Sequence, residues 1–177
     1  MTDLADLETR VRALEDVREV NDLLFAWHFA ATGGFSGLQS HRPEALDCLT
    51  DDALIAESPD RPGYGPKGRE QIAQHWGYFH GDAGPLPHVF HTSVAERVTL
   101  DGDTARQVSN MFGLLQLRGG KPVVTISQRN HAFVRTEQGW RMAYRDSAGG
   151  FSVLADELHG PLNALPPQEA RTPWKGD

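Results

Sequence analysis

The fold is decided by residues 87–117, which read PHVFHTSVAERVTLDGDTARQVSNMFGLLQL. Apolar and polar residues alternate on both sides of the sequence DGD at 101–103, and β-branched residues are frequent. Such alternation is typical of strands with one buried face, while Asp and Gly are typical of a tight turn. The stretch therefore predicts two long strands, Pro87–Leu100 and Thr104–Leu117, that run antiparallel on either side of the turn.

Two more strands are predicted downstream. A Gly-Gly pair follows the second strand and favours a hairpin with a third strand at Pro122–Arg135. A turn at 137–139 then leads into a fourth strand at Trp140–Asp146. Long strands joined by tight turns indicate an antiparallel meander. Residues 149–177 are rich in proline and are expected to form a tail laid over the domain or over a neighbouring subunit.

The chain before these strands is predicted to be mainly helical. Up to about residue 30, apolar side chains recur at spacings of three or four, on one stripe of a helix. A single bent helix and two shorter helices separated near Glu15–Asp16 fit this pattern equally well. A short helix at Pro43–Leu49, a strand at Ala53–Glu57 and a helix at Arg69–His80 follow. The narrow start of the first stripe suits packing against another subunit as well as against the core.

The order of these elements indicates an α+β fold. Helices that come first and strands that come later place the helices on one face of a strongly curved antiparallel sheet. Such a sheet, closed on one side by helices, forms a cone whose interior is a natural pocket for a small molecule. A chain of 177 residues fits one domain. We therefore expect a domain at residues 1–148, followed by the proline-rich tail at 149–177.

Composition excludes several classes of protein. The chain is 39% apolar, a content too high for a disordered protein. It has no apolar run long enough to span a membrane, so a membrane-spanning protein is not expected either. The formal net charge of −7 disfavours nucleic acid as a partner, because phosphate binding needs a basic face. The start of the chain does not resemble a secretory signal, and Cys48 is the only cysteine. We therefore expect a cytoplasmic protein, with Cys48 as a small core residue.

Eight histidines remain to be explained, and four of them fall within residues 75–91. Metal binding is not expected, since the pair at 88 and 91 on a strand and the pair at 75 and 80 on a helix both lack a chelating spacing. His91 shares its strand face with small and mixed side chains, which suits a pocket wall. A neutral imidazole there is suited to removing a proton from carbon or oxygen. His91 is therefore the main catalytic candidate.

Five pieces of the chain, in this order, resemble the SnoaL-like branch of the nuclear transport factor 2-like superfamily. They read EVNDLLFAWHFA, LTDDALIAE, GREQIAQHW, FHTSVAERVTLDGDTA and QGWRMAYRDS, and together they extend over roughly residues 10–147. The resemblance implies a cone-shaped α+β barrel and a homodimer or homotrimer. Its members include scytalone dehydratase, ketosteroid isomerase, hexachlorocyclohexane dehydrochlorinase, polyketide cyclases and the small subunits of ring-hydroxylating dioxygenases. Because these activities differ widely, the fold alone is a weak guide to the chemistry.

The resemblance also implies a catalytic pair. In the dehydratase and dehydrochlorinase members, a histidine on the first long strand is the base, and it is paired with an aspartate near the end of the N-terminal helix. The histidine corresponds to His91, whereas the aspartate position falls close to Thr32, with no carboxylate nearby. His28, one turn upstream, is a candidate for the role of the missing partner, as are Glu57 and Asp146.

These observations favour a cofactor-free lyase or isomerase that acts on a small, largely apolar molecule. His91 would transfer the proton and His28 would assist it. On strand 122–135 the more apolar face is expected to point inward, which would place Asn130 in the pocket and His131 outside it. Asparagine or tyrosine side chains would stabilise a developing oxyanion. The candidate substrate contacts are Trp27, Thr32, Glu57, Trp76, Asn110, Met111, Asn130, His131 and Tyr144.

Two other functions remain open at this stage. One is a cyclase of the polyketide or terpenoid type, which works mainly by shaping its substrate. The other is a non-catalytic module that binds a small molecule or assembles with an oxygenase, and the missing acid near Thr32 favours it. The sequence does not identify the substrate or the number of subunits.

Overall fold

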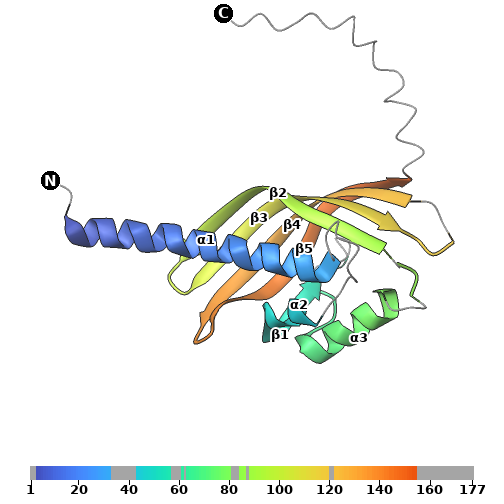
Figure 1. The fold of residues 1–177 in the computed structure, drawn as a ribbon, viewed down its shortest axis with the longest axis horizontal. Coiled ribbons are helices and arrows are strands. Elements are labelled where there is room, and N and C mark those ends of the chain that lie inside the picture. The colour runs from blue at the N-terminus through green and yellow to red at the C-terminus, as the bar shows by residue number, and fades with distance from the viewer. Residues whose placement is uncertain are drawn as a thin grey trace, which may run out of the picture.

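The computed structural model describes residues 3–32, 43–56, 61, 63–80, 84–86, 88–119 and 122–154. The described residues form three helices and five strands (Figure 1). In order they are α1 (Leu4–Thr32), α2 (Glu44–Asp47), β1 (Leu49–Ala56), α3 (Gly68–His80), β2 (His88–Asp101), β3 (Thr104–Gln116), β4 (Pro122–Thr136) and β5 (Gly139–Leu154).

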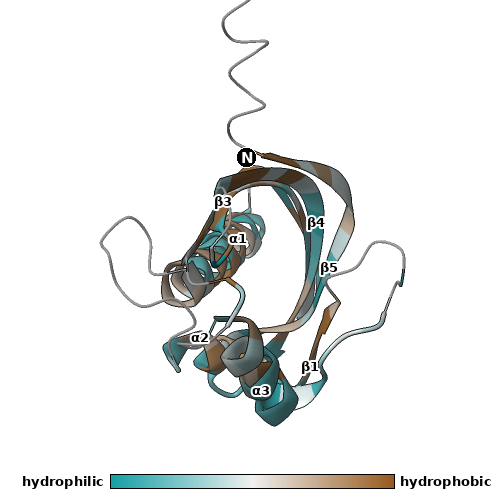
Figure 2. Cartoon of the chain, turned by 90° about the vertical axis from the view of Figure 1, so that its right-hand side faces the viewer, coloured by the Kyte–Doolittle hydropathy of each residue, from teal (hydrophilic) through white to brown (hydrophobic). Residues whose placement is uncertain are grey.

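The strands form one curved sheet in the order β1-β5-β4-β3-β2. Strands β2 to β5 make the predicted antiparallel meander, whereas β1 pairs with β5 in parallel. The sheet curls around α1, and α2 and α3 lie together at its β1 end (Figure 2). The α+β cone is therefore confirmed, but the expectation of a wholly antiparallel sheet is wrong. The chain crosses from β1 through α3 to the opposite edge of the sheet, which leaves β1 parallel to the last strand.

Helix α1 is a single helix that continues through Asp16, so the two-helix alternative is excluded. Only its second half is buried, where Val20, Leu24, Trp27 and Ala31 follow one another at helical spacing. Its first half extends beyond the sheet (Figure 1). There the apolar stripe is exposed in the single chain, at Leu4, Leu7, Val11 and Leu14.

The middle of α1 is fixed to the turn between β4 and β5. The Asp16 carboxylate forms an ion pair with Arg135 and accepts a hydrogen bond from Trp140 Nε1 at 3.4 Å. The Arg135 guanidinium lies 4.4 Å from the centre of the Trp140 ring. Trp140 and Phe133 continue into the core between the helices and the sheet. Cys48 also belongs to this core, and burial raises the pKa of its thiol.

Several element boundaries differ from the sequence-based prediction. Strand β1 begins at Leu49, within the predicted short helix, while Glu57 lies outside the described residues. Strand β5 continues to Leu154, opposite Val123 of β4. The sheet therefore extends past the predicted domain boundary at 148, and residues 155–177 of the predicted tail lie outside the described part of the chain.

The two faces of the sheet have an unusual distribution of polarity. Its concave face, toward α1, buries polar side chains, whereas the convex face exposes apolar ones. In one cross-strand row of the convex face, Phe112, Ile126 and Phe151 are opposite one another and exposed. The buried polar side chains of the sheet are Gln107, Ser109, Ser127, His131, Arg145 and Ser147.

Two β-bulges in β5 decide which of its side chains point inward. The register with β4 passes from Met142 directly to Tyr144, and from Ser147 directly to Gly149. Each skipped alanine reverses the alternation of faces. Arg145 therefore joins Met142 on the buried side instead of facing outward.

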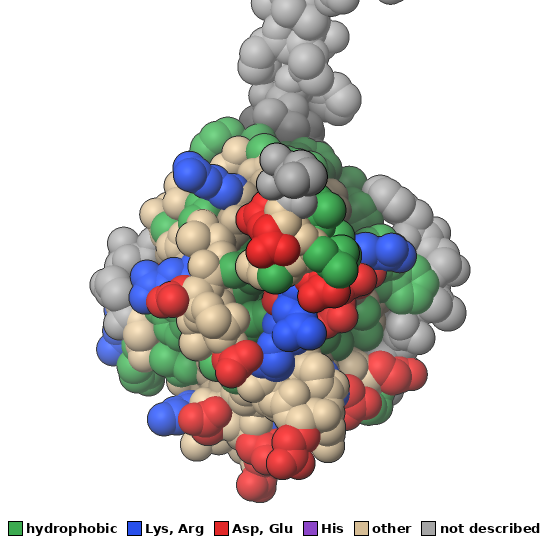
Figure 3. Space-filling model, turned by 90° about the vertical axis from the view of Figure 1, so that its left-hand side faces the viewer, with side chains coloured by type: hydrophobic (Ala, Val, Ile, Leu, Met, Phe, Trp, Pro, Cys, Tyr) green, Lys and Arg blue, Asp and Glu red, His purple; other side chains and the backbone are tan. Residues whose placement is uncertain are grey.

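The surface at the α1 end of the molecule carries acidic and basic side chains interspersed, without a large patch of one sign (Figure 3). None of the helices in the described part of the chain is long and apolar enough to cross a membrane.

Candidate active site

His28 and His91 meet inside the cone. His28 lies in the buried part of α1 and His91 lies on β2, and their Nδ1 atoms are 3.1 Å apart. Their rings are roughly perpendicular, with centres 5.2 Å apart. Trp27 supports both, because its ring stacks on His91 and meets His28 edge-on. The histidine pair is therefore held by packing as well as by a hydrogen bond.

A chain of hydroxyl groups continues from this pair. His28 Nε2 is 2.8 Å from Ser93 Oγ, and Ser109 Oγ donates to Ser93 Oγ at 3.2 Å. If Ser93 Oγ accepts from both neighbours, His28 carries its proton on Nε2 and offers the lone pair of Nδ1 to the Nδ1–H of His91. His91 then presents a basic Nε2 on the far side of its ring. If Ser93 Oγ instead donates to His28 Nε2, His28 carries its proton on Nδ1 and donates it to His91 Nδ1. His91 then carries its own proton on Nε2.

His28 is neutral at ordinary pH. Burial, together with the positive charges of Arg145 and Arg129, lowers its pKa to about 3. A neutral histidine orients its neighbour through a dipole and not through a full charge. An imidazolium that forms on His91 is consequently stabilised less by His28 than it would be by a carboxylate.

A pocket of about 190 Å³ opens beside His91. Its wall combines aromatic and aliphatic side chains with two arginines, Arg129 and Arg145. Gly113 lies between His91 and Thr125 in the cross-strand register, and a Cβ atom there would be 2.7 Å from Thr125 Cγ2. The absence of a side chain at Gly113 thus makes room next to His91. The lining residues are Trp27, Trp76, Phe79, His80, Leu86, Val89, His91, Met111, Leu115, Thr125, Arg129 and Arg145.

A row of buried polar side chains crosses three strands on the same face. Gln107, His131 and Arg145 are direct cross-strand neighbours, with 0%, 2% and 3% of their surface exposed. Burial and the charge of Arg145 hold the pKa of His131 well below its usual value. Neither ring nitrogen of His131 and neither polar atom of the Gln107 side chain has a hydrogen-bond partner within the described structure.

Three predicted contact residues lie on the opposite side of the sheet. Asn130 donates to Asp146 at 2.9 Å, and the Tyr144 hydroxyl donates to Asp146 at 3.1 Å. Asn110 is exposed on β3. The orientation expected for strand 122–135 is therefore reversed: His131 points inward and Asn130 outward. The cause is the polar interior, which makes the more apolar face of β4 the convex one.

The structure brings other predicted residues to the pocket. His91, Trp27, Trp76 and Met111 line it, and His28 lies directly behind His91. Helix α1 ends at Thr32, whose side chain is outside the described part of the structure, as is the whole of Glu57. Asp146 does not approach His91, since it faces the convex side with Asn130.

Sequence reasoning missed the two arginines, Ser93 and Gln107. Arg129 lies on the same face of β4 as His131. Its side chain could be predicted to point inward only if the more polar face of β4 were assumed to be the buried one. Arg145 could not be placed by parity, because the bulges in β5 shift the alternation. Ser93 is two residues after His91 on β2 and so lies on the same face of the strand. This spacing was the one feature of the sequence that could have placed it near His91.

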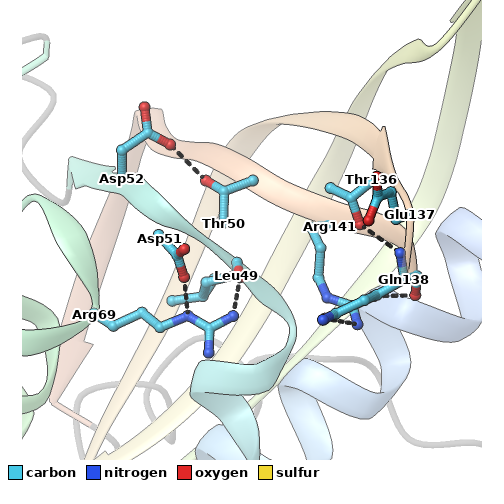
Figure 4. Close-up of a pocket in the computed structure, with 9 residues that line it drawn as sticks. All are labelled: Leu49, Thr50, Asp51, Asp52, Arg69, Thr136, Glu137, Gln138 and Arg141. Carbon is cyan, nitrogen blue, oxygen red and sulfur yellow. Dashed lines mark hydrogen bonds and ion pairs between the residues drawn. The ribbon is translucent and has the colours of Figure 1, made fainter.

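A larger hollow, of about 530 Å³, lies where β1 begins and β4 turns into β5 (Figure 4). Its arginines contact the protein itself: Arg69 Nη2 donates to the Leu49 carbonyl at 2.8 Å, and Arg141 Nη1 donates to the Gln138 carbonyl at 3.0 Å. Asp51 is exposed beside Arg69, at 3.3 Å. None of the described histidines lines this hollow, whereas His91 lines the smaller pocket, which is therefore the candidate active site.

No group of three histidine, cysteine, aspartate or glutamate side chains suited to a metal ion occurs among the described residues. His91 and His28 therefore have no third ligand of these types in the described part of the site.

In a comparison with known families, residues 12–146 match the SnoaL-like domain. Among curated proteins, none matches the chain significantly.

Solved structures with the same fold include enzymes. A candidate scytalone dehydratase from Novosphingobium aromaticivorans is 12% identical, with a TM-score of 0.66 over 80% of this chain and 88% of that one. An NTF2-like protein with a cystatin-like fold from the same organism is 24% identical, with a TM-score of 0.61 over 94% and 99%. A hexachlorocyclohexane dehydrochlorinase from Novosphingobium barchaimii is 13% identical, with a TM-score of 0.63 over 82% and 95%. At these identities the likeness establishes the NTF2-like fold alone.

Proposed function

The chain belongs to the SnoaL-like domain family, and we propose that it is a cofactor-free lyase or isomerase that transfers a proton on a small, largely apolar substrate. The observation that carries the proposal is the contact between His91 and His28 on the wall of a pocket that aromatic and aliphatic side chains line together with two arginines. The dehydratase and dehydrochlorinase named among the similar structures support lyase chemistry on this fold.

His91 is the base in this reaction. With His91 Nδ1–H donating to His28 Nδ1, the lone pair on His91 Nε2 takes a proton from a substrate carbon next to a carbonyl or similar group. The electrons of the broken C–H bond become an enolate or a new C=C bond. His28 is a positioning residue, because it fixes the tautomer and the orientation of the His91 ring.

The proton balance closes within the site. In a dehydration, the proton on His91 moves to the departing hydroxyl, which leaves as water with the electrons of its C–O bond. In an isomerisation, the same proton returns to a different carbon. Either course restores the neutral His91, and neither needs an external oxidant or reductant.

Solvent deuterium exchange tests this proposal whichever product forms. The protein is incubated in D₂O with a panel of small cyclic ketones and β-hydroxyketones, each with and without a carboxylate group, and deuterium incorporation and loss of water are followed by mass spectrometry. We expect at least one compound to exchange or to lose water, and His91→Ala to abolish this while circular dichroism shows an intact fold. His75→Gln is the matched control, because His75 packs on Phe79 and does not line the pocket.

The activities of the two variants decide whether His91 is the base, and the behaviour of the panel distinguishes an enzyme from a binding module. Full activity in His91→Ala, or equal loss in His75→Gln, would refute His91 as the base. A panel that shows tight binding but neither exchange nor loss of water, in wild type and variants alike, would favour a non-catalytic binding module.

We also propose that the protein forms a homodimer or homotrimer through the convex face of its sheet. Phe112, Ile126 and Phe151 form a continuous exposed apolar row there, and such rows mark interfaces. Light scattering coupled to size exclusion should give a dimer or trimer mass for the wild type and a lower mass for Ile126→Glu. A monomeric wild type would contradict the proposal.

A further inference from the structure

The pocket beside His91 carries positive charge on one wall. Arg129 on β4 and Arg145 on β5 both line it. Arg129 pairs with Ser147 and His131 pairs with Arg145, so the two arginines are diagonal neighbours, close enough for long side chains to reach one point. The field of both guanidinium groups extends to His28, whose pKa they help to lower.

We propose that the substrate of this pocket is an organic anion, a carboxylate on a flat apolar body, with its carboxylate held by Arg129 and Arg145. The inference rests on the proposed function only in taking this pocket as the substrate site. Guanidinium groups bind carboxylates through charge-assisted, often bidentate hydrogen bonds, which are about twice as strong as neutral ones. The aromatic and aliphatic wall around Trp27, Trp76 and Met111 accommodates the apolar body.

Two unpartnered polar side chains give independent support. The amide of Gln107 and both ring nitrogens of His131 are buried without a hydrogen-bond partner in the described structure, in one row with Arg145. A buried polar group without a partner destabilises the fold, and a catalytic role or a bound water or ion is among the usual reasons for its presence. Gln107 and His131 are not among the lining residues, so the row supplies neutral donors and acceptors behind the cationic wall, where a water molecule that accompanies the anion would satisfy them.

The position of the anion relative to the base follows from Trp27. The Arg145 guanidinium lies 4.9 Å from the centre of the Trp27 ring, and the centre of the His91 ring lies 6.1 Å from it. Arg145 and His91 thus both neighbour the Trp27 ring and both line the pocket, so a substrate held at Arg145 lies within reach of His91. The carboxylate orients the substrate, and the reacting carbon lies within its apolar body.

Binding of two matched probes tests the proposal. trans-Cinnamate and its neutral amide, trans-cinnamamide, have the same shape and differ in charge. Quenching of tryptophan fluorescence, checked by titration calorimetry at low salt, gives both dissociation constants. We expect cinnamate to bind about tenfold more tightly or better, with a preference that weakens as salt increases, since one ion-assisted hydrogen bond corresponds to this factor.

Variants separate this inference from the proposed reaction. Arg129→Gln and Arg145→Gln should each remove most of the preference for cinnamate, whereas Arg145→Lys should retain part of it. Arg106→Gln is the matched control, because Arg106 is exposed on the convex face of β3. His91→Ala should lose activity yet keep the preference. If Arg145→Gln does not fold, the half-buried Arg129→Gln still decides.

Equal affinity of the wild type for both probes would overturn the inference, as would a preference that survives in both arginine variants. An active His91→Ala protein that still prefers cinnamate would refute the proposed function and leave the anion site standing. Loss of the preference in the arginine variants, with normal behaviour of Arg106→Gln, would support the anion site.

Discussion

Lowering the pH tests whether His28 stays neutral inside the folded protein. A histidine in the unfolded chain has a pKa of about 6.5, while that of His28 in the fold is about 3. Between these values the unfolded state binds one proton more than the native state. The free energy of unfolding is therefore unaffected by protonation of this histidine above about pH 6.5 and decreases as the pH falls below that value.

The magnitude follows from linkage. One proton of difference lowers the free energy of unfolding by about 1.4 kcal/mol per pH unit, or about 2 kcal/mol between pH 6.5 and pH 5. His131, whose pKa is also held well below its usual value by burial and by the charge of Arg145, contributes in the same direction. The contribution of His28 alone is a substantial part of the roughly 5–15 kcal/mol that stabilises an ordinary domain.

Urea unfolding at one fixed protein concentration, followed by circular dichroism between about pH 5 and pH 7, measures this slope. His28→Gln should reduce it by close to one proton, and His131→Gln should reduce it in the same direction. Gln107→Met is the matched control, because it changes a buried polar neighbour that does not titrate. A slope that is the same in the wild type and both histidine variants would refute the assignment of neutral, buried histidines.

Four further results are expected. His28→Ala should reduce turnover about tenfold to a hundredfold without abolishing it, since a positioning residue is lost and the base remains; turnover equal to that of the wild type would contradict this. Met111→Trp should harm activity less than His91→Ala, because proton transfer dominates; the reverse order of activities would favour a substrate-shaping cyclase. Gly113→Val should block ligand binding beside His91, and titration of cinnamate checks it; unaltered affinity would contradict the pocket geometry. Phe133→Ala should cost about 3–5 kcal/mol in urea unfolding, as for other buried aromatic side chains.

The elements of this fold could be predicted because their signals are local. Alternation over 87–117 and the turn residues within it specify two paired strands wherever the rest of the chain lies. The parallel pairing of β1 with β5 could not be predicted, because it depends on which sheet edge the chain reaches after α3. The length of α1 was also ambiguous, since its exposed first half has no packing partner in the single chain.

The candidate site could be predicted only in part. Strand parity and the family resemblance pointed to His91, and the helical turn before Thr32 pointed to His28. The direction of β4 was predicted wrongly, because the usual expectation of an apolar interior fails when the interior is a polar pocket. Asn130 consequently lies outside and His131 inside.

By itself, the sequence determined an acidic α+β domain in which histidines without chelating spacing invite a catalytic interpretation. Only the tertiary structure decided which residues lie together. His28 and His91 are 63 residues apart in sequence, and the packing of α1 into the cone brings their Nδ1 atoms to 3.1 Å. The bulges in β5 turn Arg145 inward beside them. Periodicity defines two faces of a strand, but which face is buried depends on what packs against it.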